Sequence, residues 1–345
     1  MDYERLPRTP RTKLAIERRL RVWDHLRVNG PTPLWDQHAC LPLSVDADLS
    51  LLDQFGQGCG GFVSINVGYA PHAKAESLAL IRTFADGIDG RHGLVLASTV
   101  GDVDAAQASG RVGVVFDLED SAPLDGDLAS VAEFVSLGVR TLIPTYNHAN
   151  AAGGGCLDPQ DTGLTSWGRD LVRAMNAAGM VPDGSHCGAR TGLEMCEVSD
   201  RPVIYSHSCL RSVWDHPRNI TDEQARACAA MGGVVGIAGV GIFLGPNTAT
   251  LPALTAHLEA AVELIGIDHV GVSTDFSFDA GDFLAELAAN PGLFDDSYTR
   301  WGPIAWMTPA TMMGLGDHLS GRGWSDTDIG AVMWHNFRRV AAATW

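Results

Sequence analysis

Strand-like apolar runs alternate with helix-like segments from residue 34 onward, and this alternation constrains the fold more than any other feature. The strand-like runs cover residues 34–36, 61–67, 94–99, 112–118, 141–145, 180–183, 203–206, 233–238 and 269–274. Helix-like segments between them include residues 128–137, 168–178, 221–231 and 251–264. Such alternation is typical of a parallel sheet with helical crossovers. Because the number of runs is close to eight, with one surplus run, the sequence predicts an α/β fold, a (β/α)8 TIM-like barrel.

Five segments end a strand-like run with a residue that can bind a metal or move a proton. They are residues 35–40, 114–119, 183–186, 203–207 and 270–275. Barrel enzymes place their chemistry at the C-terminal ends of several strands. His, Cys, Glu and Asp side chains also make up the sites of hydrolases that use one or two metal ions. The sequence therefore predicts a metal site at the C-terminal rim of the barrel.

The whole chain, residues 1–345, is expected to form a single barrel domain, since α/β barrels reach this length. Residues 1–30 are expected to form an N-terminal helical extension, because basic and apolar residues interleave there at helical spacing. Residues 276–320, rich in Trp, Met, Pro and Gly, are expected to form a rim insertion over the site. A packed loop without a catalytic part is the alternative for that segment.

Charge and cysteine content restrict the partners and the compartment. The net charge of −17 argues against nucleic acid or an anionic membrane as a partner, since both attract Lys and Arg. Residues 1–8 are charged, so no signal peptide is expected, and no apolar stretch is long enough for a transmembrane helix. Seven scattered cysteines in a large chain favour a reducing cytoplasm over a disulfide framework.

His38 and Cys40 stand two residues apart at the first strand end. Alternate residues of a strand point the same way, so an imidazole and a thiolate can face one metal there. A buried, inert thiol is the alternative for Cys40. Glu119 lies in an acidic cluster with Asp117 and Asp120, and carboxylates so close repel one another unless a cation or solvent screens them. Glu119 is thus a candidate to bridge two metals, and a helix N-cap cluster is the alternative.

Four further residues complete the candidate site. His186 and His207 each follow a serine after an apolar run, and their recurrence favours metal ligands over core histidines. Asp275 ends the last run, where a carboxylate beside a metal-activated water suits proton transfer. Arg218 could clamp a substrate carboxylate with two parallel hydrogen bonds, and a surface arginine ahead of a helix that begins near Thr221 is the alternative.

These residues resemble the membrane dipeptidase (renal dipeptidase) family of zinc metallopeptidases, which are amidohydrolase-like barrels. The resemblance covers residues 34–340, and its most specific stretches are Asp183-Gly184-Ser185-His186, Tyr205-Ser206-His207-Ser208 and Asp215-His216-Pro217-Arg218-Asn219. It implies a hydrolase with one or two Zn²⁺ ions, a dipeptide or related small amide as substrate, and a homodimer.

The resemblance also implies a role for each candidate residue. First come the metal ligands: His38 for the first metal, Glu119 as the bridge, and His186 and His207 for the second. Among the residues that act on the substrate, Asp275 would be the general acid/base and Arg218 would hold the terminal carboxylate. Tyr146 stands where many family members carry a substrate-contacting His, and a Tyr can donate a hydrogen bond but carries no positive charge.

Cys40 is the clearest departure from the family, which has His-x-Asp where this chain has His38-Ala39-Cys40. Asp36 matches the residue before the His and does not replace the missing ligand. Three outcomes stay open: a thiolate-ligated dinuclear site, a mononuclear site, or a metal site with other chemistry. A second departure is Asp120-Ser121, where small glycines are usual.

The first hypothesis is therefore a dipeptidase in which a metal-activated water attacks the amide, assisted by Glu119 and Asp275. Hydrolysis of another small amide, such as an N-acyl amino acid, is the second hypothesis. A catalytically silent family member that binds metal is the third.

Overall fold

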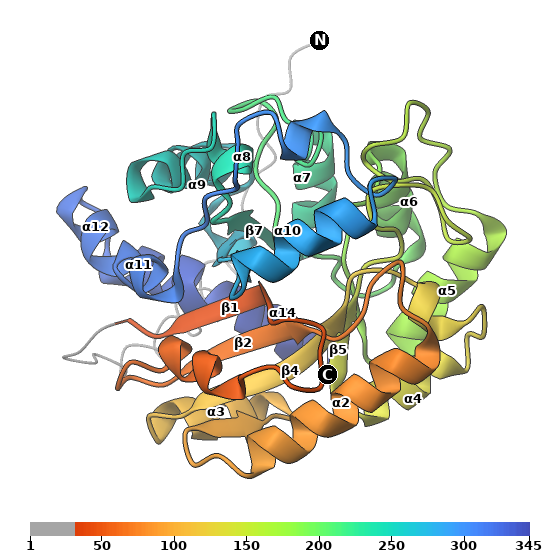
Figure 1. Cartoon of the computed structure of the whole chain (residues 1–345). Helices are drawn as coiled ribbons and strands as arrows, with labels where there is room; N and C mark the ends of the chain where they lie inside the picture. The colour runs from red at the N-terminus through yellow and green to blue at the C-terminus, as the bar shows by residue number, and fades with distance from the viewer. Residues whose placement is uncertain (1–31) are drawn as a thin grey trace, which may run out of the picture. The chain divides into compact units, whose positions relative to one another are not determined.

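Parallel strands at the centre of the computed structural model form a ring surrounded by helices (Figure 1). The structure describes residues 32–345, and the N-terminal helical extension predicted over residues 1–30 lies outside the described residues. Thr32–Trp345 pack as one compact unit. The strands are β1 (Leu34–Cys40), β2 (Gly61–Asn66), β3 (Leu94–Leu96), β4 (Val112–Leu118), β5 (Val139–Leu142), β6 (Val181–Pro182), β7 (Val235–Ala238), β8 (Val270–Ser273) and β9 (Phe276–Ser277).

Backbone pairing runs around the ring. Strands β6, β5, β4, β2, β1 and β9 are neighbours in that order, and β7 pairs with β8. The run at residues 203–206 joins the two groups through parallel bridges from Ile204 to Asp183 and from Tyr205 to Val235. On the other side, β9 directly follows β8 and pairs in parallel with β1, and the amide of Asp275 donates to the carbonyl of His38 (3.0 Å). The predicted TIM-like barrel is confirmed.

The surplus strand is β3, which adds to the ring without being part of it. It pairs only with the first half of β4, from Leu94 opposite Val112 to Leu96 opposite Val114. Strand β5 pairs with β4 only from Phe116 onward, so β3 and β5 share one edge of β4. Apolar composition could not distinguish β3 from a barrel strand, because the difference lies in pairing. Strand β1 is longer than predicted, since Cys40 pairs with Ser277.

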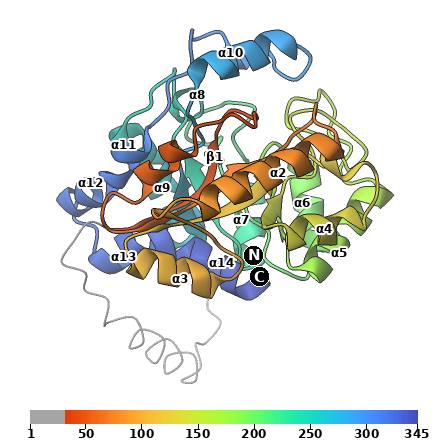
Figure 2. The same cartoon turned by 60° about the horizontal axis from the view of Figure 1, so that its bottom comes forward.

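Helices surround the ring, most of them on its outside and α10 at one end (Figures 1 and 2). They are α2 (Lys74–Asp89), α3 (Val100–Ala108), α4 (Ser130–Ser136), α5 (Ser166–Ala178), α6 (Ala189–Val198), α7 (Asp222–Ala230), α8 (Gly241–Leu244), α9 (Leu251–Ile265), α10 (Ala280–Ala289), α11 (Pro309–Met313), α12 (Leu315–Gly321), α13 (Asp326–Gly330) and α14 (Asn336–Thr344). Short helical turns are η1 (Leu49–Phe55), η2 (Ala122–Leu124), η3 (Ile267–His269), η4 (Asp296–Tyr298) and η5 (Ala331–His335).

Local sequence explains where helix α5 begins and ends. Thr165 caps its N-terminus by accepting a hydrogen bond from the amide of Gly168. Leu171 and Met175, four residues apart, bury one face against the barrel. Gly179 ends the helix in the left-handed region at φ 77°, where a residue without Cβ is favoured. Every residue of β4 is buried, because helices cover the outer face of a parallel barrel sheet.

The segment predicted as a rim insertion, residues 276–320, contains β9, α10, η4, α11 and all but the last residue of α12. Its helix α10 lies at one end of the barrel, opposite the end where α3, α13 and α14 lie (Figure 2). Contacts assign the α10 end to the C-terminal ends of the strands. Tyr69, after β2, hydrogen-bonds to Glu286 of α10, and Asn147, after β5, donates to the carbonyl of Leu293 (2.9 Å).

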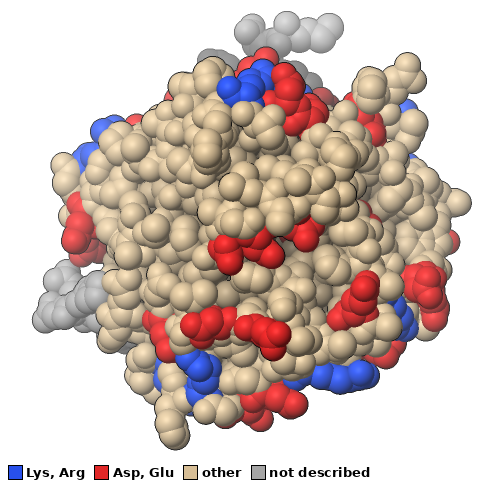
Figure 3. All heavy atoms as spheres, in the orientation of Figure 1, with Lys and Arg blue, Asp and Glu red and all other residues tan. Residues whose placement is uncertain are grey.

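On the face that Figure 3 shows, acidic side chains are scattered and Lys and Arg lie toward its borders. Within residues 32–345, no helix combines the length and the apolar character needed to cross a membrane.

Candidate metal centre

Three histidines from different strand ends converge on one oxygen of Glu119. The Nε2 atoms of His38 and His186 each lie 3.3 Å from Glu119 Oε1, and the Nε2 atom of His207 lies 3.7 Å from it. His38 belongs to β1, Glu119 directly follows β4, and the two other histidines follow β6 and the run at residues 203–206. The barrel thus brings together four residues that are up to 169 positions apart in the sequence.

The second nitrogen of each of these imidazoles is already engaged by the protein. Each Nδ1 lies close to one polar oxygen: Asp117 Oδ1 for His38 (3.1 Å), Asn147 Oδ1 for His186 (2.7 Å) and Ser206 Oγ for His207 (2.8 Å). Nδ1–H donation to the carboxylate and to the amide oxygen leaves the Nε2 atoms of His38 and His186 directed at the centre. Metal-binding histidines are held in this way in proteins.

Glu119 is held from behind by Asn66, whose amide nitrogen donates to Glu119 Oε2. Burial alone would raise the pKa of this carboxyl, but His38 and His186 hold it well below its usual range. The N-cap position of the turn that follows, η2, is Ser121, and the side chain of Asp120 accepts from the amide of Ala122 (2.7 Å).

Burial and nearby charge set opposite protonation states on the histidines. Burial lowers the pKa of His186 to about 3, with the charge of Arg218 adding to the effect, and holds the pKa of His207 well below 6.5. For His38, burial acts in the same direction, but the charges of Asp117 and Glu119 outweigh it and raise its pKa well above 6.5. Two neutral imidazoles therefore face one carboxylate.

Cys40 reaches the same centre from β1. Its Sγ lies 3.4 Å from His38 Nε2, although the register of β1 against β2 shifts between Asp36 and Ala39. Burial raises the pKa of the Cys40 thiol to about 12, because the attraction of His38 does not compensate for burial and for the charge of Glu119. A thiol at this place requires a nearby cation to ionise.

Asp36 does not face the centre but fastens β1 to the end of β8. Its Oδ1 accepts from the Ser273 hydroxyl (2.9 Å) and from the amide of Thr274 (3.0 Å). Its carboxylate therefore positions the strand ends that carry His38 and Asp275. This arrangement agrees with the sequence argument that Asp36 does not replace the missing carboxylate ligand.

Asp275 closes the group from the end of β8. Its Oδ1 lies 3.8 Å from His38 Nε2, and its backbone is left-handed at φ 49°. Burial raises the pKa of Asp275 to about 7, with the charge of His38 opposing and that of Glu119 adding to the shift. A carboxyl with such a pKa can both accept and release a proton near neutrality.

Arg218 is a buried guanidinium beside the centre, with a side chain only 2% exposed. Its Nη2 donates to the carbonyl of His207 (3.5 Å), and its buried Nε has no hydrogen-bond partner among the described residues. No carboxylate within residues 32–345 forms an ion pair with it. The alternative of a surface arginine is wrong, because Arg218 is buried. The helix that follows, α7, is capped by Thr221.

Tyr146 packs on a metal-ligand candidate. Its ring stacks on the ring of His186 with centroids 4.1 Å apart. The atypical Asp120-Ser121 pair positions this loop, since Asp120 Oδ2 accepts from the amide of Tyr146 (2.8 Å) and Ser121 donates to the carbonyl of Pro144 (2.8 Å). These two residues therefore link the end of β4 to the loop after β5.

Several residues that shape the centre carry no signal in the sequence. Asn66, Asn147 and Ser206 hold the candidate ligands, yet single amides and hydroxyls in a sequence are too common to be noticed. Asn147, His186 and Asp275 also have positive φ, at 61°, 62° and 49°. Strained backbone of this kind gathers at functional sites. Only the packed barrel reveals it.

The donor atoms fit one or two divalent cations. Three groups of potential ligand atoms lie within 4.8 Å of one another: His38, Cys40 and Glu119; Glu119, His186 and His207; and His38, His207 and Asp275. The Nε2 atom of His207 is buried without a hydrogen-bond partner among the described residues, which is costly unless an ion or another polar group satisfies it. Glu119 is shared by two groups, as a bridging carboxylate would be.

One protein family and several known proteins are similar to this chain. Residues 60–291 match the family described as membrane dipeptidase (peptidase family M19). An uncharacterized protein in the pqqA 5′ region of Klebsiella pneumoniae is 27% identical over 282 residues, 78% of this chain and 95% of that protein. Dipeptidase verJ of Clonostachys rogersoniana is 30% identical over 206 residues, 59% of this chain and 53% of that protein. The structure of an amidohydrolase from Pseudomonas aeruginosa superposes with a TM-score of 0.81 at 25% identity, covering 91% of this chain and 97% of that one.

Proposed function

We propose that this chain, which belongs to the membrane dipeptidase family of metal-dependent hydrolases, hydrolyses the amide bond of dipeptides. The reaction takes place at the cluster formed by His38, Glu119, His186 and His207. One observation carries the proposal: three imidazole Nε2 atoms converge on one oxygen of Glu119 while the protein holds every Nδ1. This arrangement would offer a divalent cation the neutral imidazoles of His186 and His207, the imidazole of His38 once it releases its proton, and the carboxylate of Glu119.

Two metal positions share Glu119 in this proposal. His38 and Cys40 hold the first, and His186 and His207 hold the second. A thiolate donor favours zinc over magnesium or manganese, so Zn²⁺ is the proposed ion. When bound, divalent cations polarise the amide carbonyl and lower the pKa of water. Cys40 donates more charge than the usual carboxylate, so we expect a weaker Lewis acid at the first position.

Three further side chains act on the substrate. Arg218, buried without a carboxylate partner among residues 32–345, binds the terminal carboxylate of the dipeptide. Asp275 accepts the proton from the attacking water and passes it to the departing amine. Tyr146, fixed against His186, offers its hydroxyl to the substrate without adding charge.

We propose a cytoplasmic homodimer formed by a single domain over residues 1–345, with residues 276–320 as the rim insertion. All seven cysteines are free thiols, which supports a reducing compartment. The dimer rests on the resemblance to the family alone. Sedimentation of the purified chain measures it directly.

Turnover by the zinc-loaded protein on matched panels of dipeptides and N-acyl amino acids tests the proposed function. Hydrolysis of dipeptides is expected, and a His186→Ala, His207→Ala double variant should lose metal by elemental analysis. Exclusive hydrolysis of N-acyl amino acids would favour the second hypothesis. Full metal content without any turnover would favour a silent metal-binding protein.

A further inference from the structure

Residues 293–298 of the rim insertion meet the metal centre at the side chain of Asn147. The amide nitrogen of Asn147 donates to the carbonyl of Leu293 (2.9 Å), and its Oδ1 accepts from the hydroxyl of Tyr298 (3.2 Å). The same Oδ1 accepts from Nδ1 of His186 (2.7 Å). Asn147 and Tyr298 are both buried, so water competes little for these bonds.

The carbonyl of Leu293 selects the orientation of the Asn147 amide. A backbone carbonyl only accepts hydrogen bonds, so it must face the amide nitrogen and not Oδ1. Oδ1 then faces His186, and because this oxygen also only accepts, Nδ1 of His186 must carry the proton. His186 is neutral near pH 7, since burial lowers its pKa to about 3. A proton on Nδ1 therefore leaves Nε2 without hydrogen, which is the form that binds a metal.

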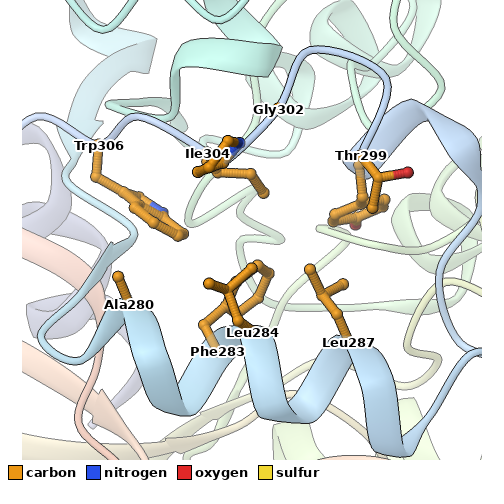
Figure 4. A pocket seen from close by; sticks show the side chains of 10 residues that line it. Ala280, Phe283, Leu284, Leu287, Thr299, Gly302, Ile304 and Trp306 are labelled. Atoms are coloured by element: carbon orange, nitrogen blue, oxygen red, sulfur yellow. The ribbon is translucent and has the colours of Figure 1, made fainter.

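Tyr298 combines this hydrogen bond with a place in the wall of a cavity. The cavity, of about 240 Å³, lies between α10 and the loop that follows η4, and Tyr298 is one of the residues that line it (Figure 4). The other lining residues include Phe283 and Leu287 of α10 and Trp306 of the loop. A phenylalanine at position 298 would keep the ring for this wall and remove only the hydroxyl.

The same segment also reaches His186 by packing. The ring centroid of Phe294 lies 6.1 Å from that of Tyr146, and the Tyr146 ring stacks on His186 with centroids 4.1 Å apart. The ring of Phe294 in turn lies 5.0 Å from that of Tyr298. Residues 293–298 therefore act on His186 by two routes, a polar one at Nδ1 and an apolar one on the face of the ring.

We infer that residues 293–298 position His186 for metal binding, and that Tyr298 is a positioning residue that acts through Asn147. Displacement of the segment would free the Asn147 amide to rotate. A rotated amide presents its nitrogen to Nδ1 of His186 and favours the proton on Nε2, where it blocks a metal. Because coupling is reciprocal, a metal bound to His186 also stabilises the segment in its place. This inference rests on the metal centre of the proposed function and not on the substrate.

The test compares the zinc affinity of the full chain with that of Tyr298→Phe, by competition with a chromophoric chelator. The variant is expected to bind zinc roughly two- to tenfold more weakly, which is the size of one hydrogen bond. Tyr69→Phe is the matched control, because the Tyr69 hydroxyl binds Glu286 of α10 and not Asn147. Its zinc affinity should equal that of the original protein.

A double-mutant cycle shows whether Tyr298 acts through Asn147. In an Asn147→Gly background, Tyr298→Phe should cost no further zinc affinity, because the oxygen that the hydroxyl binds is gone. Amide hydrogen exchange of the original protein measures the reciprocal effect without any substitution. Zinc should slow exchange at residues 293–298 and leave α3, at the opposite end of the barrel, unchanged (Figure 2).

Weaker zinc binding in Tyr298→Phe that is absent from Tyr69→Phe and from the Asn147→Gly background supports the inference, and so does slower exchange at residues 293–298 with zinc. Unchanged affinity in a folded Tyr298→Phe variant overturns it. An equal loss in Tyr69→Phe, or the same loss in the Asn147→Gly background, overturns it as well. Exchange at residues 293–298 that zinc leaves unchanged has the same consequence.

Turnover measurements separate this inference from the proposed function. Zinc binding that depends on the Tyr298 hydroxyl, without hydrolysis of any dipeptide, supports the positioning role while the proposed function fails. Hydrolysis of dipeptides by a protein whose zinc affinity does not depend on that hydroxyl overturns the inference alone. An original protein that binds no zinc overturns both.

Discussion

Asn147→Gly removes the side chain that holds His186 without straining the backbone. Asn147 Oδ1 accepts from His186 Nδ1 at 2.7 Å, and its Nδ2 donates to the carbonyl of Leu293 at 2.9 Å. Glycine is the right replacement because residue 147 has a φ of 61°, which alanine adopts only at a cost. The variant removes the bond to His186 together with the bond to Leu293, so its control is a variant that loses a comparable loop contact away from the centre.

The expected effect is a loss of metal affinity at the position formed by His186, His207 and Glu119. Removing a partner that orients a ligating imidazole typically costs 10–100-fold in affinity. That factor corresponds to about 1.4–2.8 kcal/mol. It agrees with the roughly 1–3 kcal/mol cost of leaving a buried N–H without a partner, which is the state of His186 Nδ1 in the variant.

Zinc competition with a chromophoric chelator measures this loss, and thermal unfolding checks that the fold is intact. Asn247→Gly is the matched control, since Asn247 also has positive φ (58°) and also anchors a loop, through the carbonyl of Pro303 (2.8 Å). Its zinc affinity should equal that of the original protein. Unchanged zinc affinity in a folded Asn147→Gly variant would refute the view that this amide orients His186 for a metal.

Three further predictions concern proton transfer, substrate binding and pH. Asp275→Asn should keep its metal and lose about 10²–10⁴-fold in kcat, and a near-normal rate with full metal would exclude Asp275 as the acid/base. Arg218→Lys should raise KM for dipeptides about tenfold or more, because an ammonium cannot make two parallel hydrogen bonds to a carboxylate, and an unchanged KM would argue against that contact. Burial lowers the pKa of His257 from 6.5 to about 4. As the pH falls, the unfolded chain therefore takes up a proton on this residue before the folded protein does. The stability that neutral His257 contributes is complete above pH 6.5 and is lost as the pH falls toward 4. Between pH 7.5 and pH 5, the free energy of unfolding should therefore fall by about 2 kcal/mol less in His257→Gln than in the original protein. Denaturant titrations at the two pH values measure both falls, and equal falls would contradict this reasoning.

The features of the fold that follow from the local order of residues could be predicted from the sequence. The alternation of runs predicted the barrel, and the polar residue after each run predicted which strand ends meet. The structure brings His38, Glu119, His186 and His207 together, because parallel strands of a barrel all end at the same rim.

Features that depend on pairing or on the third dimension were not predictable. Strand β3 reads like a barrel strand, yet it shares an edge of β4 with β5. Asn147 looks like an ordinary loop residue, yet it contacts both His186 and Tyr298, and Tyr298 lies 151 positions further along the chain than Asn147. The burial of Arg218 was also hidden, because its neighbours Asp215 and Asn219 suggest a surface turn.

Anomalous diffraction at the zinc edge, from crystals of the zinc-loaded protein, tests the central claim that the strand ends form a metal centre. The account predicts a peak bonded to Glu119 and to the Nε2 atoms of His186 and His207, and a second peak about 2.3 Å from Cys40 Sγ. A second peak with the sulfur turned away, or no second peak, would show that Cys40 is not a ligand. Zinc-loaded crystals with no peak within bonding distance of Glu119 and both histidines would contradict the account as a whole.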